Sequence, residues 1–355
     1  MKLKLILYLI LVFSTAKTFS QNLYSINGKV KSDKGNPIEY ATVFLEGSTQ
    51  LTKTNSNGEF IFEGLKPGNH KVVVRMLGYS SVNETLIIND KKVNKNFILS
   101  ESSVQLKEVA IGNNSKRKEL MELFFLTLIG RSENAASCKI LNPEVIEFST
   151  NGNVLQATSK DFIIIENKNL GYHLKYLIND FRHNTKSQIT VYDGSCNFEE
   201  MPGNEKLQTK WNKNRRFAYN GSLIHFLRSL YAGNTEAEGF LCDQTKSHET
   251  SRALTPHDVR QYVSKSDRNF INFKTKYHLR FFYLGKPISL RSKYSNVHIR
   301  EMLDKNIETN YISLYIDSAV IDSQGSYLDY KSFLLDGNWA RKRLGDRLPF
   351  SYLPN

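Results

Sequence analysis

The sequence predicts an N-terminal all-β antiparallel sandwich followed by a C-terminal α+β domain that is strand-rich with two or three helices. Three observations carry this prediction. Short segments of alternating apolar residues, separated by Gly and Pro turns, fill residues 24–110. Two segments with helical spacing, 115–130 and 221–233, stand among further strand-like segments in the remainder. A chain of 355 residues with 40% hydrophobic content is long enough for two domains with separate cores.

Residues 1–20 have the features of a secretory signal peptide. Lys2 and Lys4 precede an apolar run over residues 5–13, and small polar residues follow at a spacing that suits cleavage. The run is well short of the ~20 residues that a membrane-spanning helix requires. We therefore expect an exported mature chain that starts near Gln21, lies in the periplasm or at the outer membrane, and has no transmembrane segment after signal removal. No Cys follows the run, so a lipoprotein is not expected.

The charge balance is basic. The formal net charge of +13 includes three lysines of the signal, which leaves +10 on the mature chain. Such a balance favours an anionic partner, such as an anionic surface component of the cell envelope. Solvated lysines that only keep the protein soluble are the alternative explanation. Export disfavours nucleic acid as the partner.

The three cysteines lack the close pairs that hold zinc. Cys138, Cys196 and Cys242 are far apart in the sequence, and one disulfide at most can form among them. Spacing alone selects no pair, and three separate buried thiols fit the sequence equally well.

The first domain, residues 24–110, is predicted from six short segments rich in Val, Ile, Phe and Thr. They read YSINGKV, EYATVFLEG, GEFIFEGL, HKVVVRM, NETLIIN and KNFILS. The turns between them contain Gly or Pro, which supply positive φ or preset a turn, at Lys34–Pro37, Asn57–Gly58, Lys66–Asn69 and Leu77–Gly78. Short strands at this spacing predict a small antiparallel sandwich.

Four motifs occur in order along this segment: a G-x-V start, G-x-P-I-x-x-A-x-V, T-x-x-x-G-x-F and L-x-P-G-x-H. With them the segment resembles the carboxypeptidase-regulatory-like domain, a transthyretin-like β-sandwich with a carbohydrate-binding-like fold. The resemblance implies a scaffolding or recognition module of a Bacteroidota-type envelope protein. The remainder looks like the uncharacterised C-terminal region that accompanies this sandwich in other such proteins, which implies no reaction.

A polar linker, 111–118, leads into the second domain, 119–355. A helix over 115–130 is predicted from apolar spacing, with Ser115 as a possible cap and Gly130 as its end. Strand-like segments fill residues 138–200 and 270–330, and a short helix is expected at 256–265. A further helix over 221–233 has Ser222 as N-cap and Gly233 as C-terminal stop.

The strongest binding candidate is a basic and aromatic run at 210–221, next to that helix. Cationic side chains beside aromatic area could seat an anionic group such as phosphate or sulfate. The alternative is that the arginines pair with neighbouring acids while the histidine lies half-buried. The predicted binding residues are Lys210, Trp211, Arg215, Arg216, His225 and Arg228.

No catalytic residue, metal site or cofactor is predicted. His298 and Glu301 have the His-x-x-Glu spacing of metallocarboxypeptidases, but no histidine follows that could complete the zinc ligands. The segment 55–59 imitates part of a calcium loop but is better explained as a hairpin turn. Glu199 and Glu200 are adjacent, so in a strand they point to opposite faces and not toward each other.

The sequence thus favours a non-catalytic cell-envelope protein, in which a β-sandwich interaction module is fused to a domain that binds an envelope protein, a glycan or an anionic surface component. The alternative is a secreted hydrolase of peptides or glycans with the sandwich as accessory module. A concave pocket with convergent ionisable side chains would favour the hydrolase, and a shallow basic surface would favour the binding protein.

Overall fold

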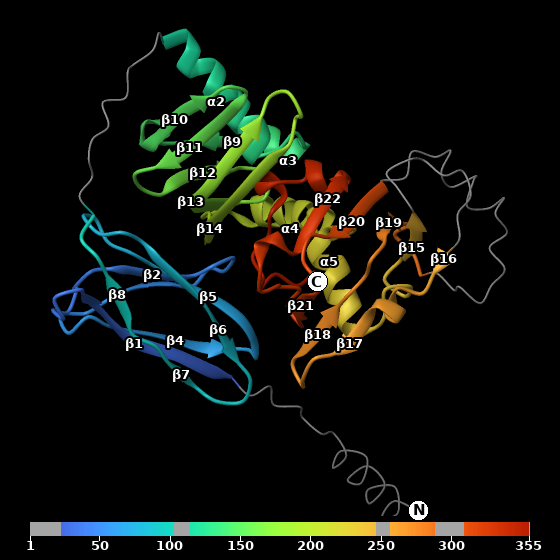
Figure 1. Cartoon of the computed structure of the whole chain (residues 1–355), viewed down its shortest axis with the longest axis horizontal. Helices are drawn as coiled ribbons and strands as arrows, with labels where there is room; N and C mark the ends of the chain where they lie inside the picture. The colour runs from blue at the N-terminus through green and yellow to red at the C-terminus, as the bar shows by residue number, and fades with distance from the viewer. Residues whose placement is uncertain (1–22, 103–113, 246–255, 288–308, 355) are drawn as a thin grey trace, which may run out of the picture.

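A computed structural model of the chain describes residues 23–102, 114–245, 256–287 and 309–354 (Figure 1). The expected signal at 1–20 and the pair His298 and Glu301 lie outside these residues. The described chain forms a β-sandwich and a strand-rich α+β region that holds two separate hydrophobic cores. No helix among the described residues is long and apolar enough to cross a membrane.

The sandwich consists of two sheets. One has the order β4-β1-β7, with β8 also paired to β1, and the other has the order β3-β2-β5-β6. The strands are β1 (Tyr24–Ser32), β2 (Thr42–Leu45), β3 (Leu51–Lys53), β4 (Glu59–Leu65), β5 (Gly68–Arg75), β6 (Val82–Ile88), β7 (Val93–Asn94) and β8 (Phe97–Leu99). The predicted sandwich is therefore confirmed.

Alternation along β1 shows why these residues form a sandwich. Ile26 and Val30 are fully buried between the sheets, whereas Asn27 and Lys29 point outward. Gly28 lies where the chain between β7 and β8 crosses close to β1, because a Cβ atom there would lie 1.7 Å from the backbone oxygen of Lys95. A side chain at that position would push the crossing strand away.

The α+β region begins with α2 (Asn114–Leu128) and the single turn α3 (Glu133–Ala136), which accompany a six-stranded sheet. The ring of Phe124 on α2 packs edge-on against that of Phe181, 4.9 Å between centroids. The sheet has the order β10-β11-β13-β12-β9, with β14 paired to β13. Its strands are β9 (Cys138–Ile140), β10 (Ile146–Asn151), β11 (Val154–Ser159), β12 (Ile163–Asn167), β13 (Tyr172–Asn184) and β14 (Thr190–Glu200).

Two helices then lead into the last part, α4 (Glu205–Tyr219) and α5 (Leu223–Ala232). That part has a five-stranded sheet, β16-β15-β19-β20-β22, and a three-stranded sheet, β17-β18-β21. Phe226 of α5 is fully buried in its core with Phe281 and Trp339. The elements are β15 (Phe240–Thr245), β16 (Pro256–His257), β17 (Val263–Lys265), β18 (Phe270–Phe273), β19 (His278–Tyr283), β20 (Thr309–Leu314), β21 (Ala319–Asp322), β22 (Phe333–Gly337) and α7 (Asn338–Arg341).

The helices differ from the prediction in three places. Helix α2 already begins inside the predicted linker, at Asn114. The short helix expected at 256–265 is wrong, since this segment forms β16, a 3-10 turn (Val259–Tyr262) and β17. Helix α4 was not predicted, because polar residues dominate it, its buried face includes Arg215, and the exposed Leu207 and Phe217 break the apolar pattern.

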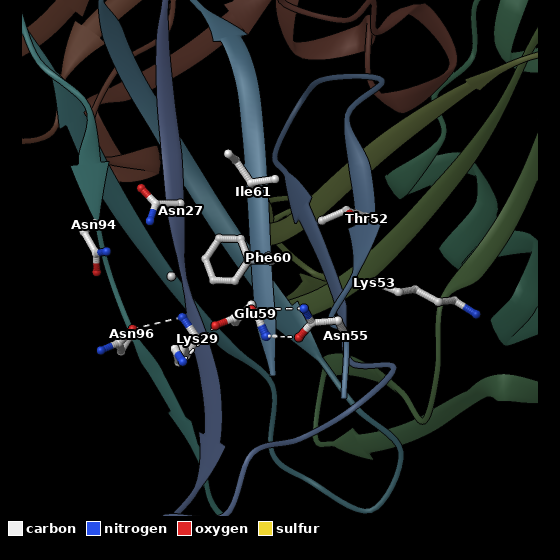
Figure 2. Close-up of a pocket in the computed structure, with 11 residues that line it drawn as sticks. Asn27, Lys29, Thr52, Lys53, Asn55, Glu59, Phe60, Ile61, Asn94 and Asn96 are labelled. Carbon is white, nitrogen blue, oxygen red and sulfur yellow. Dashed lines mark hydrogen bonds and ion pairs between the residues drawn. The ribbon is translucent and has the colours of Figure 1, made fainter. Parts of the chain in front are cut away.

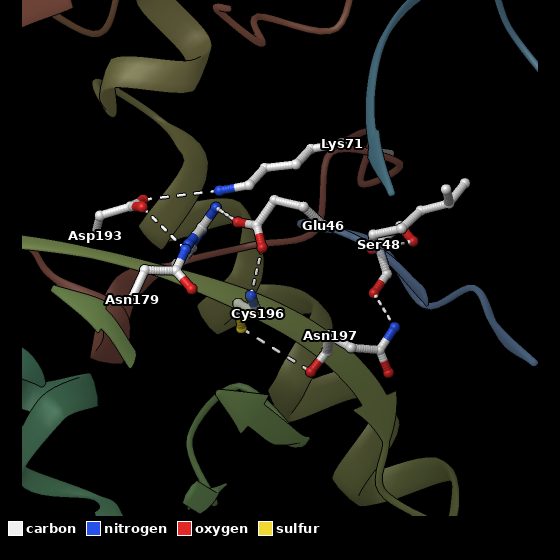
Figure 3. Close-up of polar contacts among 9 residues, drawn as sticks. Glu46, Ser48, Lys71, Asn179, Asp193, Cys196 and Asn197 are labelled. Carbon is white, nitrogen blue, oxygen red and sulfur yellow. Dashed lines mark hydrogen bonds and ion pairs between the residues drawn. The ribbon is translucent and has the colours of Figure 1, made fainter. Parts of the chain in front are cut away.

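The sandwich joins the α+β region along the free edge of β14 (Figure 3). The backbone N–H of Gly47 donates to the carbonyl of Cys196 at 2.7 Å, and that of Phe198 donates to Ser48 at 2.9 Å. The Glu46 carboxylate accepts the Cys196 N–H and pairs with Arg347, each at 2.5 Å. The loop after β2 therefore covers strand-edge groups that would otherwise remain unpaired.

Apolar and polar contacts extend this interface over the β3-β2-β5-β6 sheet. Phe44 and Val73, on the outer face of that sheet, are buried against Leu177 of β13. At the start of β5, the Asn69 N–H donates to a carboxylate oxygen of Asp322 at 2.8 Å. The opposite sheet, β4-β1-β7, keeps its outer face exposed.

Residues 338–352, which we call the strap, connect all three cores. Trp339 lies in the last core, and its indole N–H donates to the Gly221 carbonyl at 2.7 Å. Leu344 and Leu348 belong to the core beneath the six-stranded sheet. The N–H of Phe350 then donates to Gly47 of the sandwich at 2.7 Å. The strap therefore fixes the three parts against one another.

Candidate functional site

The six residues predicted to bind an anion come from two successive helices. Lys210, Trp211, Arg215 and Arg216 lie on α4, and the other two lie on α5. Trp211 is buried, and its indole N–H donates to the backbone carbonyl of Lys168 at 2.9 Å. Its position is explained by packing, since the ring also fills the space above two glycines, Gly171 and Gly203.

Two of the three arginines bind backbone carbonyls. Arg215 is 5% exposed, donates to the carbonyls of Leu170 and Gly171, and lies 3.9 Å from the ring centroid of Tyr172. Arg228 donates to the carbonyls of Gln324, Phe350 and Tyr352. Within the described part of the chain, the guanidinium of Arg215 pairs with one carboxylate, that of Glu200 at 3.4 Å. Both side chains hold backbone in place, and little of their hydrogen-bonding capacity remains for a ligand.

His225 is buried in an aromatic cluster at the start of α5. Its Nδ1 accepts the N–H of Gly221 at 3.1 Å, which leaves the proton on Nε2, 3.1 Å from the Glu238 carboxylate. Burial lowers the pKa of His225, although Glu238 raises it. Its ring stacks on that of Tyr219 with centroids 4.8 Å apart. The imidazole therefore has two partners already and is neutral near neutral pH.

The exposed side of α4 carries the remaining predicted residues. Lys206, Lys210 and Lys213 are spaced at i, i+4 and i+7, so they form one stripe, which Phe217 continues at i+11. Phe217 is 76% exposed. Among the described residues, none pairs with these lysines. Arg216 is also exposed and flanks the stripe. We call these four residues, Lys206, Lys210, Lys213 and Phe217, the lysine stripe.

A second surface feature is a shallow groove of about 530 Å³ on the sandwich (Figure 2). It crosses β7, β1 and β4 on the exposed sheet face and reaches β3. Figure 2 shows amide side chains on both sides of a central ion pair, Lys29 with Glu59 at 2.8 Å. Its lining consists of Asn27, Gly28, Lys29, Thr52, Lys53, Asn55, Glu59, Phe60, Ile61, Asn94 and Asn96.

Most polar groups of the groove are bound to one another. Asn55 donates to the Glu59 carboxylate at 3.1 Å, and its own oxygen accepts two backbone N–H groups of the turn. The Asn55 side chain thus stabilises a turn. A hairpin turn was the explanation preferred for this segment, which only imitates part of a calcium loop. The amides of Asn27 and Asn94 have no hydrogen-bond partner among the described residues. The groove therefore presents a mainly polar surface beside the exposed Lys53 and Ile61.

The cysteines are all free thiols. Cys196 and Cys242 are buried and Cys138 is half-buried. Burial raises the pKa of Cys138 to about 12 and also raises the pKa values of Cys196 and Cys242, so all three are protonated near neutral pH. Across residues 23–102, 114–245, 256–287 and 309–354, no cluster of three or more His, Cys, Asp or Glu side chains is arranged to hold a metal ion.

Residues 26–111 match the family model of the CarboxypepD_reg-like domain. The sandwich is thus a carboxypeptidase-regulatory-like domain, as its motifs indicated. The match covers the first domain and does not extend into the α+β region. No curated protein matches the chain.

Solved structures align only with a small part of the chain. A 3-chlorocatechol 1,2-dioxygenase from Rhodococcus opacus is 12% identical over 24% of this chain and 62% of its own, with a TM-score of 0.20. A cohesin–X-dockerin complex from Acetivibrio cellulolyticus is 18% identical over 21% and 56%, with a TM-score of 0.20. A minor pilin of Streptococcus agalactiae is 14% identical over 23% and 46%, also at 0.20. The chain spans less than two thirds of each, and likeness this low carries no functional argument.

Proposed function

We propose that the protein is a non-catalytic component of the cell envelope that binds an anionic surface through the lysine stripe of α4. The observation that carries this proposal is the division of α4 into two faces. Trp211, Arg215 and Ala218 are buried on one side, while Lys206, Lys210 and Lys213 lie together on the other. The lysines make no ion pair among the described residues, so their charge is available to a partner.

The partner that fits this face is a surface of phosphate-bearing lipid headgroups. Each lysine near an anionic membrane surface contributes about 1 kcal/mol of attraction at moderate salt. Phe217, at the end of the stripe, could place its ring at the boundary between headgroups and acyl chains, where aromatic side chains are favoured. Three lysines and one ring give weak, salt-sensitive binding, so a second contact is required for stable attachment.

The sandwich is proposed to supply this second contact. Its β3-β2-β5-β6 sheet is covered by the α+β region, whereas the face that bears the groove is open. A β-sandwich with one covered and one open face is suited to hold a partner in a fixed orientation relative to α4. Exported proteins meet both lipid surfaces and protein partners, and the expected export signal is consistent with this role.

The test is sedimentation of the mature chain with vesicles. Binding to vesicles with 30 mol% anionic phospholipid is compared with binding to zwitterionic vesicles at low and physiological salt. The variant Lys206→Glu/Lys210→Glu/Lys213→Glu is expected to lose at least tenfold in affinity for the anionic vesicles. These exposed lysines are preferred to Arg215 as a target, because a change at the buried Arg215 would confuse lost binding with lost stability.

The matched control is Lys66→Glu/Lys91→Glu/Lys92→Glu, which makes the same change of net charge on exposed residues of the sandwich that do not line the groove. We expect it to retain most of the affinity. Equal losses in both variants would show that only net charge matters. Unchanged binding in the α4 variant would remove the stripe from the proposal.

A further inference from the structure

The groove on the open sheet of the sandwich lies where the strand ladder beside β1 is interrupted. Strand β7 pairs with β1 at Ile26 and Asn27, and β8 pairs with it again over Val30–Ser32. Between these pairs the regular ladder is broken, and the N–H of Lys29 donates to the side-chain oxygen of Asn96 at 2.9 Å instead of to a strand carbonyl. The hollow of about 530 Å³ opens at this interruption.

Two rows of side chains cross the groove, because residues paired across neighbouring strands lie side by side on one face of a sheet. The first row is Ile61, Asn27 and Asn94, and the second contains the ion pair of Glu59 with Lys29 (Figure 2). Neighbouring strands lie ~4.8 Å apart, so the two amides of the first row are close enough to contact one ligand. The volume is also within the range of small-molecule sites, ~300–1,000 Å³.

The centre of the groove carries no net charge. Its charged lining residues are Lys29, Lys53 and Glu59. Lys29 and Glu59 pair at 2.8 Å, and hydrogen bonds from Lys29 and Asn55 lower the pKa of Glu59, so the pair stays ionised near neutral pH. The side chain of Lys53 extends away from the others (Figure 2). A ligand of either charge would meet a like charge at the central pair, and an uncharged ligand would not.

The amides of Asn27 and Asn94 are the hydrogen-bonding groups that remain available. Within the described part of the chain, neither side chain has a hydrogen-bond partner, although the two residues are neighbours in one row. Each carboxamide offers two N–H donors and one carbonyl acceptor in a plane. The pair therefore suits a ligand that carries several adjacent groups able both to donate and to accept hydrogen bonds.

The lining disfavours a protein or peptide as this ligand. Protein interfaces are centred on apolar or aromatic anchors, and peptides that extend a sheet add to a free strand edge and not to its face. Ile61 is 52% exposed, whereas Phe60, the aromatic residue of the lining, is 5% exposed. The groove thus offers a partner one apolar side chain and, among its lining residues, no accessible aromatic ring.

We propose that the groove binds a neutral saccharide, whose hydroxyl groups bond to the amides of Asn27 and Asn94 while a C–H face of the sugar lies against Ile61. A hydroxyl both donates and accepts a hydrogen bond, so neighbouring hydroxyls match neighbouring amides without any charge. This inference rests on the proposed function, since it names the class of partner for the second contact that was assigned to the open face of the sandwich.

The experiment applies the mature chain to an array of immobilised neutral oligosaccharides built from hexoses and N-acetylhexosamines. Two parallel arms carry anionic oligosaccharides with hexuronic acids and uncharged peptides. We expect a subset of the neutral oligosaccharides to capture the chain. Their affinity, measured with the soluble oligosaccharide, should be the same at low and high salt, because a neutral ligand has no ionic attraction that salt could screen.

The variant Asn27→Asp/Asn94→Asp keeps the size of both side chains but removes their N–H donors. It should weaken binding to a captured oligosaccharide at least tenfold. The matched control is Asn83→Asp/Asn89→Asp, which makes the same change on two exposed asparagines in and just after β6, outside the groove. We expect this control to bind as the wild type does. Thermal unfolding of both variants checks that they fold alike.

The lysine-stripe triple variant should bind the oligosaccharide normally, because it leaves the sandwich unchanged. If it loses vesicle binding in neither salt condition while saccharide binding persists, the lipid contact fails and the saccharide site stands. The saccharide site itself is overturned if no neutral oligosaccharide captures the chain, if the anionic arm binds more tightly, or if Asn27→Asp/Asn94→Asp binds as the wild type does. Capture by uncharged peptides alone would also overturn it and assign this face to a protein partner.

Discussion

At the scale of single residues, several arginines of this chain act as backbone anchors. Arg228 binds three carbonyls from two segments, and Arg215 binds two at the end of the β12–β13 turn. Such contacts are strong because the donor is charged. The net charge of the mature chain therefore overstates the charge available to a partner, which is concentrated on exposed lysines and on arginines such as Arg131.

One buried carboxylate links domain docking to pH. Asp322 is fully buried and accepts N–H groups from Asn69, Gln324 and Ser326. Burial raises its pKa from the ordinary 3.8 to about 6, against the opposing effect of those hydrogen bonds. Between these two pH values the folded state holds a proton that the unfolded state has lost, so stability falls as pH rises.

The variant Asp322→Asn removes this titration. We expect the wild type to lose up to about 3 kcal/mol of unfolding free energy relative to Asp322→Asn between pH 4 and pH 7, since each unit of pKa shift corresponds to about 1.4 kcal/mol. Urea unfolding at each pH measures the difference. Asp317→Asn, an exposed aspartate of the same region, is the control. If the difference in unfolding free energy between the wild type and Asp322→Asn stays constant with pH, the pH dependence does not come from Asp322.

At the scale of elements, local signals explain which helices could be predicted. Helix α5 has an N-cap, a C-terminal glycine and an apolar stripe, which are all signals that a sequence can show. Ser222 accepts the N–H of His225, Gly233 adopts φ +69°, and the buried residues recur at helical spacing. Helix α4 buries an arginine and a tryptophan, so a hydrophobic pattern does not reveal it. Its start does carry local signals, since the cap Asn204 accepts the N–H of Leu207 and Glu205 lies in the first turn.

Because the pattern of α4 does not reveal which of its faces is buried, the sequence also limits the prediction of binding residues on that helix. The basic and aromatic run at 210–221 lies largely on α4, where Lys210 and Arg216 are exposed and Trp211 and Arg215 are buried. The run alone could not separate the exposed from the buried residues, because that distinction depends on the helix phase. Whether the exposed residues bind a partner stays a prediction.

The cap of α5 can be tested alone. Ser222→Ala removes the acceptor for the His225 N–H and should lower the free energy of unfolding by about 1 kcal/mol. Ser222→Asp keeps an acceptor at this position and should retain most of the stability. Urea unfolding of both variants checks this. Equal stability of Ser222→Ala and wild type would show that water replaces the cap at no cost.

At the scale of the whole molecule, the sandwich and the α+β region are locked together by contacts between distant segments. Glu46 and Gly47 immediately follow β2, yet their partners are Cys196, Arg347 and Phe350. The sequence predicted both parts, but not this contact, because a strand edge can pair with any extended segment that reaches it. Rigid docking fixes the open face of the sandwich relative to α4.

Gly47 provides a test of that docking. Gly47→Ala would place a methyl group 2.4 Å from the ring of Phe350. Gly35→Ala is the matched control, because Gly35 also has positive φ, +84° against +67°, but has no atom within 4 Å of the added Cβ. Both variants are destabilised by roughly 1 kcal/mol, because alanine is strained at positive φ. We expect Gly47→Ala to lose clearly more, and to separate one cooperative thermal transition into two. If the thermal unfolding curves of Gly47→Ala and Gly35→Ala coincide, the sandwich and the α+β region are not coupled through the loop after β2.

The strap has a consequence for biosynthesis. It emerges from the ribosome after all the segments that it joins, so until then only direct contacts, such as those of Gly47 and Ser48 with β14, hold the sandwich against the six-stranded sheet. Phe44 and Val73, which Leu177 of β13 covers in the finished protein, face solvent or an escorting factor only until β13 has been made and has docked. Maturation should therefore end with the addition of the strap to parts that are already in contact, and conditions that delay the earlier docking would expose an apolar patch to other newly made chains.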